Sequence, residues 1–327
     1  MIGFDFKPDP ERARALNVRM HRELGSSLQH VVDEAAGPLD LDAAAIQPLL
    51  GNLSKGVSYP ATTFARYYDL VAEIDDDNLD AARRLYAELC EAKPIGPGLH
   101  VASLGDPELG PDSERYTAMM NEDPSVELGF TYPSPEVAAA FKERLARGWA
   151  LLDKAIPELS GEIKQIIREV IIAGSDPTKK YQFDGGSHYR LWGALFLNGQ
   201  YHPDDVAVCE VLAHESAHSL LFGFTVDEAL QNNDDEELYA SPLRADPRPM
   251  DGIYHATFVS ARMHWAMTRL ANSGLLSARQ REQALDAAAS DLTNFDAGYG
   301  VVAEHGILTS TGAALMRGAH DYMQSVR

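Results

Sequence analysis

The sequence predicts an α+β fold that is mostly helical, with a small β-sheet beside one histidine-bearing helix in its C-terminal part. Apolar residues recur at three- and four-residue spacing over most of the chain, which is the period of an amphipathic helix. Two short segments, 166–172 and 189–198, instead have the β-branched and aromatic composition of strands. Two strands followed by a helix and then by further helices is the order expected of an α+β protein.

The N-terminal region is expected to be helical. Helical spacing covers 13–36 and 63–92, with breaks at Gly37-Pro38 and Tyr59-Pro60. The segment 93–98, KPIGPG, combines proline and glycine in a way that is typical of a boundary. We therefore predict a helical region over 1–98 and a catalytic domain over 99–327, or alternatively one continuous unit.

The predicted catalytic domain begins irregularly. Residues 99–133 are rich in Pro, Asp and Gly, and a long helix is expected over 135–156. A polar loop at 174–187 separates the two predicted strands. After them, HPDD at 202–205 indicates a helix start, with acidic residues in the first turn of a helix over 204–223.

Composition narrows the class of protein. The formal net charge of −21 argues against nucleic-acid binding, which needs clustered Lys and Arg. No apolar run of 18 residues is present, so no membrane span is expected, and the N-terminus lacks the apolar core of a signal peptide. With only two cysteines, we expect a reducing, cytoplasmic location. Nothing in the sequence indicates an oligomeric state.

The helix over 204–223 contains the motif that carries chemistry, His214-Glu215-Ser216-Ala217-His218, an HExxH. Four residues along a helix rotate by about 400°, so both imidazoles project from one face. That spacing allows both histidines to bind one metal ion, with Glu215 beside the open coordination position. We therefore predict a metalloenzyme with ligands His214 and His218.

A metal site needs a third protein ligand, and two residues are candidates. Glu237 follows His218 at a spacing known from zinc peptidases, but it lies in the acidic run 234–237, and such runs are usually solvated. His255 opens an apolar helix expected to reach about Leu270, although a lone histidine there is more often structural. Spacing alone does not decide between them.

A longer pattern resembles a known family. The stretch 241–249, SPLRADPRP, is followed by Gly252 and His255, and it comes after the HExxH helix and a strand that ends in Leu-Asn. Together these features, spanning about 190–270, resemble the HExxH-motif proteins of ribosomal-peptide natural-product biosynthesis. Members of that family are 2-oxoglutarate-dependent peptide β-hydroxylases.

The resemblance implies a zincin-like fold that binds iron. It implies Fe(II) held by His214, His218 and His255, with open positions for 2-oxoglutarate and dioxygen. The distal carboxylate of 2-oxoglutarate needs a cation, for which an arginine is best suited. Arg262, two helical turns after His255, is the first choice, and Arg248 is the second.

The implied substrate is a peptide or peptide-like molecule, hydroxylated at a β-carbon. It would pair with the strand beside the HExxH helix, and Tyr189 and Asn198 are the predicted contacts. Two alternatives remain open. One is a zinc metallopeptidase that uses Glu215 as general base. The other is a non-catalytic peptide-binding partner with a structural metal.

Overall fold

The computed structural model describes residues 5–122, 129–179, 183–244 and 246–327. Within these ranges the protein is mostly helical with one small mixed sheet and one two-stranded hairpin, which confirms the predicted α+β class. No helix of the described residues is long and apolar enough to cross a membrane.

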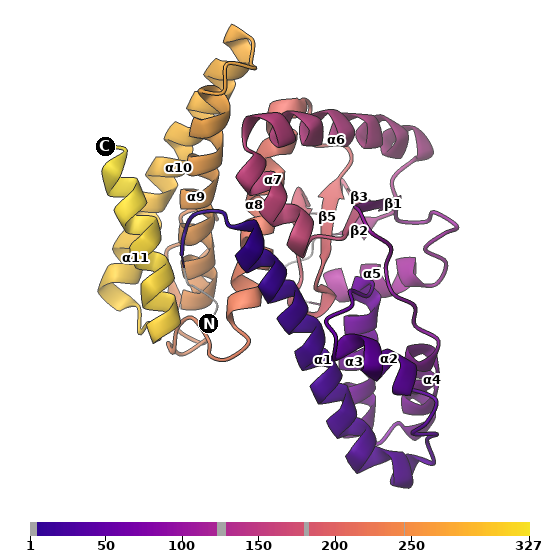
Figure 1. Ribbon diagram of the computed structural model, residues 1–327. Helices are drawn as coiled ribbons and strands as arrows, with labels where there is room; N and C mark the ends of the chain where they lie inside the picture. The colour runs from indigo at the N-terminus through magenta and orange to yellow at the C-terminus, as the bar shows by residue number, and fades with distance from the viewer. Residues whose placement is uncertain (1–4, 123–128, 180–182, 245) are drawn as a thin grey trace. The chain divides into compact units, whose positions relative to one another are not determined.

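The elements follow one another along the chain as shown in Figure 1. The helices are α1 (Pro10–Leu39), α2 (Gln47–Leu53), α3 (Ala61–Asp75), α4 (Leu79–Cys90), α5 (Asp112–Met120), α6 (Pro135–Ala155), α7 (Pro157–Ile166), α8 (Asp205–Phe224), α9 (Met250–Ala271), α10 (Ala278–His305) and α11 (Ser310–Ser325), with a 3-10 turn at Tyr189–Leu191. The strands are β1 (His100–Ser103), β2 (Phe130–Thr131), β3 (Glu169–Ser175), β4 (Gly185–Gly186), β5 (Ala194–Asn198), β6 (Leu238–Tyr239) and β7 (Arg248–Pro249).

The chain forms two compact units. The histidine-bearing unit consists of Met1–Ala13, Ala139–Ile163 and Gln200–Arg327, and the sheet-bearing unit consists of Arg14–Ala138 and Lys164–Gly199. The division therefore does not fall at the expected boundary, 98/99. The physical reason is that β1, just after that position, pairs in parallel with β3, which joins this part of the chain to the unit of the N-terminal helices.

The sheet-bearing unit is built around β3, whose residues are all buried. The strand order is β1-β3-β5-β4, and β2 pairs with β3. Strands β3 and β5 are parallel, with Val170 opposite Leu195. The predicted strand 189–198 is shorter than expected, because Gly193 has a φ of +96° and the strand begins after it.

Two other expectations for this unit differ from the structure. The helix expected over 63–92 is broken into α3 and α4, since Asp77 between them has a φ of +55°. The segment 99–133, expected to be irregular, contains β1, α5 and β2. Strands β1 and β2 are short, and their pairing with β3 rather than local periodicity gives them their form.

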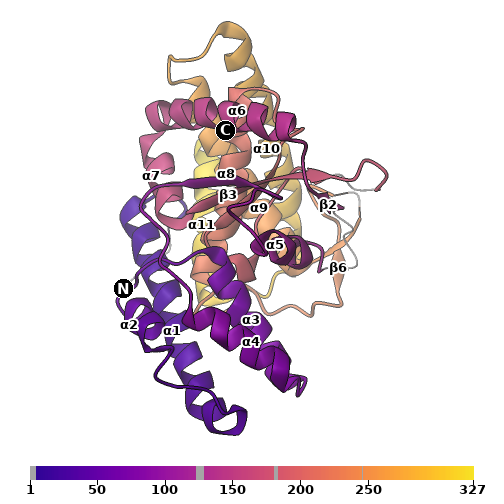
Figure 2. The same cartoon turned by 90° about the vertical axis from the view of Figure 1, so that its right-hand side faces the viewer.

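The histidine-bearing unit packs α8 against α9, and α9 against α10 and α11, as Figures 1 and 2 show. Helix α8 is apolar on nearly every side and mostly buried, as a core helix should be. Its start is fixed by Asp204, whose carboxylate accepts hydrogen bonds from the backbone N–H of Val206 and Ala207, each at 3.0 Å. The helix predicted over 204–223 is therefore confirmed within one residue.

Candidate metal centre

Helix α8 presents the two motif histidines together. The Nε2 atoms of His214 and His218 lie 3.2 Å apart, as the four-residue spacing predicts. Two imidazole nitrogens bound to one metal at about 2.0–2.2 Å would be roughly 3.0–3.4 Å apart. The separation of this pair therefore fits adjacent ligands of a single metal ion.

His255 joins this pair from α9. Its Nδ1 lies 3.1 Å from the Nδ1 of His218, and the two rings are stacked at 16°. The ring of Phe222 of α8 also lies near His255, with ring centroids 5.6 Å apart. The structure thus brings together the three predicted histidines, although His255 lies 37 residues after His218 and on a different helix.

A thioether fixes the tautomer of His214. Its Nδ1 lies 3.1 Å from the sulfur of Met263 on α9. Sulfur of this kind has no hydrogen to donate, so the contact requires the proton to be on Nδ1. Nε2 of His214 then keeps its lone pair, directed toward His218, which is the state that a metal ligand needs. Sequence reasoning did not find Met263, because nothing local marks a core methionine as a partner.

All three imidazoles are held in the neutral state. Burial lowers the pKa of His214 to about 4, with smaller contributions from the charges of His202 and Arg244. Burial also lowers the pKa of His218 well below its usual range, and it lowers the pKa of His255. Neutral imidazole is the metal-binding form, so this environment favours coordination over protonation.

The three rings do not yet converge on one point. No three His, Cys, Asp or Glu side chains in the described ranges are arranged to hold a metal ion. His218 faces His214 with Nε2 but faces His255 with Nδ1. The donor set, neutral imidazoles from two helices, has the chemistry of a metal site, but in the described ranges its nitrogens are not arranged around one point.

The two acidic candidates occupy different environments. Glu215 is buried, and its Oε1 lies 3.7 Å from Nε2 of His214, beside the site as predicted. Glu237 is exposed, and its carboxylate accepts a hydrogen bond from the hydroxyl of Tyr239. The structure thus brings His255 to the HExxH pair, while the contacts of Glu237 are with the hairpin strand β6.

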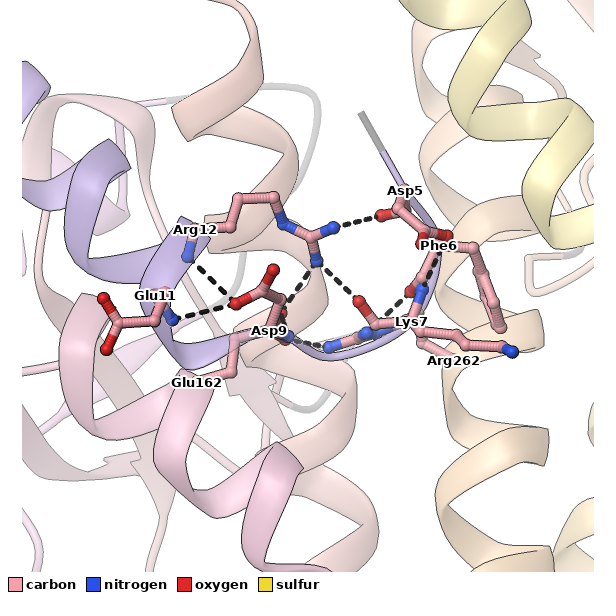
Figure 3. A network of polar contacts seen from close by, with 8 residues as sticks. All are labelled: Asp5, Phe6, Lys7, Asp9, Glu11, Arg12, Glu162 and Arg262. Carbon is pink, nitrogen blue, oxygen red and sulfur yellow. Dashed lines mark hydrogen bonds and ion pairs between the residues drawn. The ribbon is translucent and has the colours of Figure 1, made fainter. Parts of the chain in front are cut away.

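Arg262 is bound to partners inside the protein. It is 1% exposed, forms an ion pair with Glu162 and donates a hydrogen bond of 2.8 Å to the carbonyl oxygen of Phe6. Arg12 binds the other oxygen of the same carboxylate at 3.0 Å. Figure 3 shows this cluster and the N-terminal segment that it holds. Arg262 lies on the expected helix, but its guanidinium is committed to internal partners.

Arg248 is partly committed. It is in β7 and pairs with Asp246 at 2.7 Å, whereas its buried Nε has no hydrogen-bond partner among the described residues. Arg244, four residues earlier, is exposed, and its positive charge acts on both His214 and His218. Within the described ranges its side chain forms no ion pair. Arg244 lies in the stretch SPLR, which formed part of the resemblance described above. It was not chosen from the sequence, because it lies outside a helix and helical spacing could not relate it to His255.

The two predicted substrate contacts belong to the sheet-bearing unit. Tyr189 is 45% exposed and stacks near Tyr68, with centroids 5.5 Å apart. Asn198 is fully buried, and its amide donates hydrogen bonds to Ser175 and to the carbonyl of Phe183. Tyr189 is therefore partly exposed beside Tyr68, while Asn198 closes the end of β5.

No family model and no curated protein matches the chain. The function proposed below is therefore inferred from the histidines, their surroundings and the resemblance of the segment 241–255.

Proposed function

We propose that this protein is an Fe(II)/2-oxoglutarate-dependent oxygenase that hydroxylates a peptide or peptide-like substrate. The observation that carries the proposal is the all-histidine neighbourhood of the HExxH pair, with His255 rather than Glu237 beside it. Neutral imidazoles suit Fe(II), although they suit zinc as well. The resemblance of the segment 241–255 to peptide β-hydroxylases supports the choice of iron.

His214, His218 and His255 would hold the metal. Bound Fe(II) with 2-oxoglutarate and dioxygen supplies the oxidising power for hydroxylation, with 2-oxoglutarate converted to succinate and carbon dioxide. Met263 holds the proton of His214 on Nδ1. Buried Glu215 orients water or substrate beside the open positions.

A cation is needed for the distal carboxylate of 2-oxoglutarate, and Arg244 takes this role in our proposal. Arg262 is committed to Glu162, and Arg248 is paired with Asp246. The guanidinium of Arg244 is exposed, and its positive charge contributes to the lowered pKa of His214 and of His218. A planar guanidinium binds a carboxylate through two parallel hydrogen bonds.

The test is an anaerobic titration of metal-free protein with Fe(II) and then with 2-oxoglutarate. We expect a visible charge-transfer band that disappears when oxygen is admitted, with formation of succinate. A His214→Ala/His218→Ala variant is the matched control and should give no band. Wild-type protein without a band, under conditions where Fe(II) binds, would contradict the proposal.

A zinc peptidase is the second candidate, favoured by one observation. Glu215 lies where a general base would stand in such an enzyme, 3.7 Å from a ligand nitrogen. Tightly bound zinc together with cleavage of peptides, abolished in Glu215→Gln, would support this alternative. In the oxygenase, Glu215→Gln should retain the charge-transfer band.

A further inference from the structure

A groove of about 570 Å³ lies between α1 and α3 in the sheet-bearing unit, and none of its lining residues was considered for the metal centre. The two helices contact each other where His21 meets Phe64, with ring centroids 5.1 Å apart. From that contact both helices run on in the same direction along the groove. Its lining residues are Ser26, Ser27, His30, Val31, Glu34 and Ala35 of α1, and Tyr67, Val71, Ile74 and Asp75 of α3.

The floor of the groove is apolar and half-exposed. Val31 and Ala35 are four residues apart on α1, and Tyr67 and Val71 are four apart on α3, so each pair forms a ridge along its helix. Other apolar residues of α1, such as Leu28, are fully buried. Two parallel ridges with an open channel between them are the shape into which a third helix packs.

At one end of the groove, acidic side chains lie near helix C-termini, where basic side chains are more favourable. Asp75 is the last residue of α3, and Glu34 lies near the end of α1. The C-terminal end of a helix carries partial negative charge and normally attracts Lys or Arg. Neither helix has a basic residue in its last turn. Within the described ranges, neither Glu34 nor Asp75 forms an ion pair.

We propose that this groove binds a peptide segment as an amphipathic helix, with apolar side chains on the floor and Lys or Arg over Glu34 and Asp75. A basic end would offset the charge of both carboxylates and the partial negative charge of both helix C-termini. Without it, these like charges repel one another. A second copy of this chain is a poor occupant, because both copies carry a formal net charge of −21.

The proposal is independent of the proposed function, since binding is measured without metal or 2-oxoglutarate. The probe is a fluorescein-labelled synthetic helix with leucines on one face and lysines at its N-terminal end, mixed with full-length protein and a chelator. A peptide with glutamates in place of the lysines is the control probe. We expect fluorescence anisotropy to show micromolar binding of the lysine peptide and none of the glutamate peptide.

Two variants locate the site. Glu34→Gln/Asp75→Asn should weaken binding about tenfold. Glu23→Gln/Glu91→Gln removes the same charge from exposed positions that do not line the groove and should leave binding unchanged. Ala35→Phe fills the channel at a half-exposed position and should abolish binding, with circular dichroism confirming that the protein is folded.

The proposal is overturned if wild-type protein binds neither peptide or binds both equally. It is also overturned if Glu34→Gln/Asp75→Asn binds like wild type. Self-association of the protein that Ala35→Phe abolishes would assign the groove to a second copy instead. Loss of binding in the groove variants, with the charge-transfer band intact, would separate this site from the metal centre.

Discussion

Helix α9 contributes to two buried polar clusters that differ in their partners: one contains ion pairs, and the other contains neutral imidazoles. At Arg262, every strong charge faces an opposite charge or a carbonyl oxygen: Glu162 binds both Arg262 and Arg12. Seven residues earlier, His255 faces other imidazole nitrogens, and no carboxylate ion pair closer than 3.7 Å reaches the three rings.

The difference shows how a structural polar cluster can be told from a functional one. A buried ion pair costs desolvation energy and is tolerated when its hydrogen bonds are complete. Clustered neutral imidazoles with lowered pKa values face one another through ring nitrogens, and such nitrogens can also bind a cation. The same helix therefore serves stability at one position and, in our proposal, metal binding at the other.

The largest effect is expected at the structural cluster. Glu162→Ala leaves two buried guanidinium groups without their carboxylate, so the free energy of unfolding should fall by about 3–5 kcal/mol. Urea denaturation measures it. Glu158→Ala, in an exposed pair with Arg269, is the control and should cost less than about 0.5 kcal/mol. A loss below about 1 kcal/mol for Glu162→Ala would mean that the cluster is not a stabilising one.

The next effect is expected at the histidines. His255→Ala should weaken Fe(II) binding about a hundredfold, since it removes a ligand, while the free energy of unfolding of the metal-free protein changes little. Glu237→Ala should leave the affinity unchanged, because Glu237 contacts Tyr239. Competition with a chromogenic chelator measures both. The reverse result would make Glu237 the third ligand.

A smaller effect is expected for Arg244, the proposed partner of 2-oxoglutarate. Arg244→Gln should weaken 2-oxoglutarate binding to the metal-loaded protein about tenfold, because it removes the proposed carboxylate partner. Arg269→Gln, on the exposed surface of α9, is the control. Calorimetric titration measures the affinity. If Arg248→Gln weakens binding instead, the anion site lies at the buried Nε of Arg248.

The smallest effect concerns a third buried group, Asp291 of α10, which resembles neither cluster. Burial, aided by the charge of Glu210, raises its pKa to about 8, and its Oδ2 has no partner among the described residues. The unfolded-state pKa is about 3.9. The folded state therefore holds an extra proton between about pH 4 and 8, and the protein should lose stability as the pH rises through that window.

Asp291→Asn removes this titration. Its free energy of unfolding should depend less on pH between about 4 and 8 and should exceed that of wild type at pH 9 by on the order of 1 kcal/mol. The gain is limited because the amide is still a buried polar group. Urea denaturation across pH measures it, with exposed Asp286→Asn as control. An unchanged pH dependence would show that Asp291 is already ionised in the folded state.

Some of the site could be predicted because it depends on one helix. The apolar surroundings of 204–223, the acidic first turn and the four-residue spacing placed His214 and His218 on a common face, and the structure agrees to within one residue at the helix ends. The nearness of His255 to that pair was expected only from the resemblance, since its distance along the chain gave no geometric information.

Two other predicted residues, Arg262 and Asn198, have internal partners that the sequence did not indicate. Helical periodicity places Arg262 on the same face of α9 as His255. Its guanidinium nevertheless forms an ion pair with Glu162, 100 residues away in the chain. Asn198 was expected at a substrate, but Ser175 and Phe183 take its amide. Periodicity predicts the direction in which a residue points along its own helix or strand, and it says nothing about what lies opposite.

The sequence by itself determined the helical α+β class, the limits of α8 and the pairing of its two histidines, because these follow from backbone geometry over a few residues. Only the tertiary structure decided that Met263 contacts Nδ1 of His214, that Arg262 belongs to an internal ion pair and that the charge of Arg244 lowers the pKa of His214. Each of these depends on contacts between segments far apart in the chain, where packing and charge pairing select the partner.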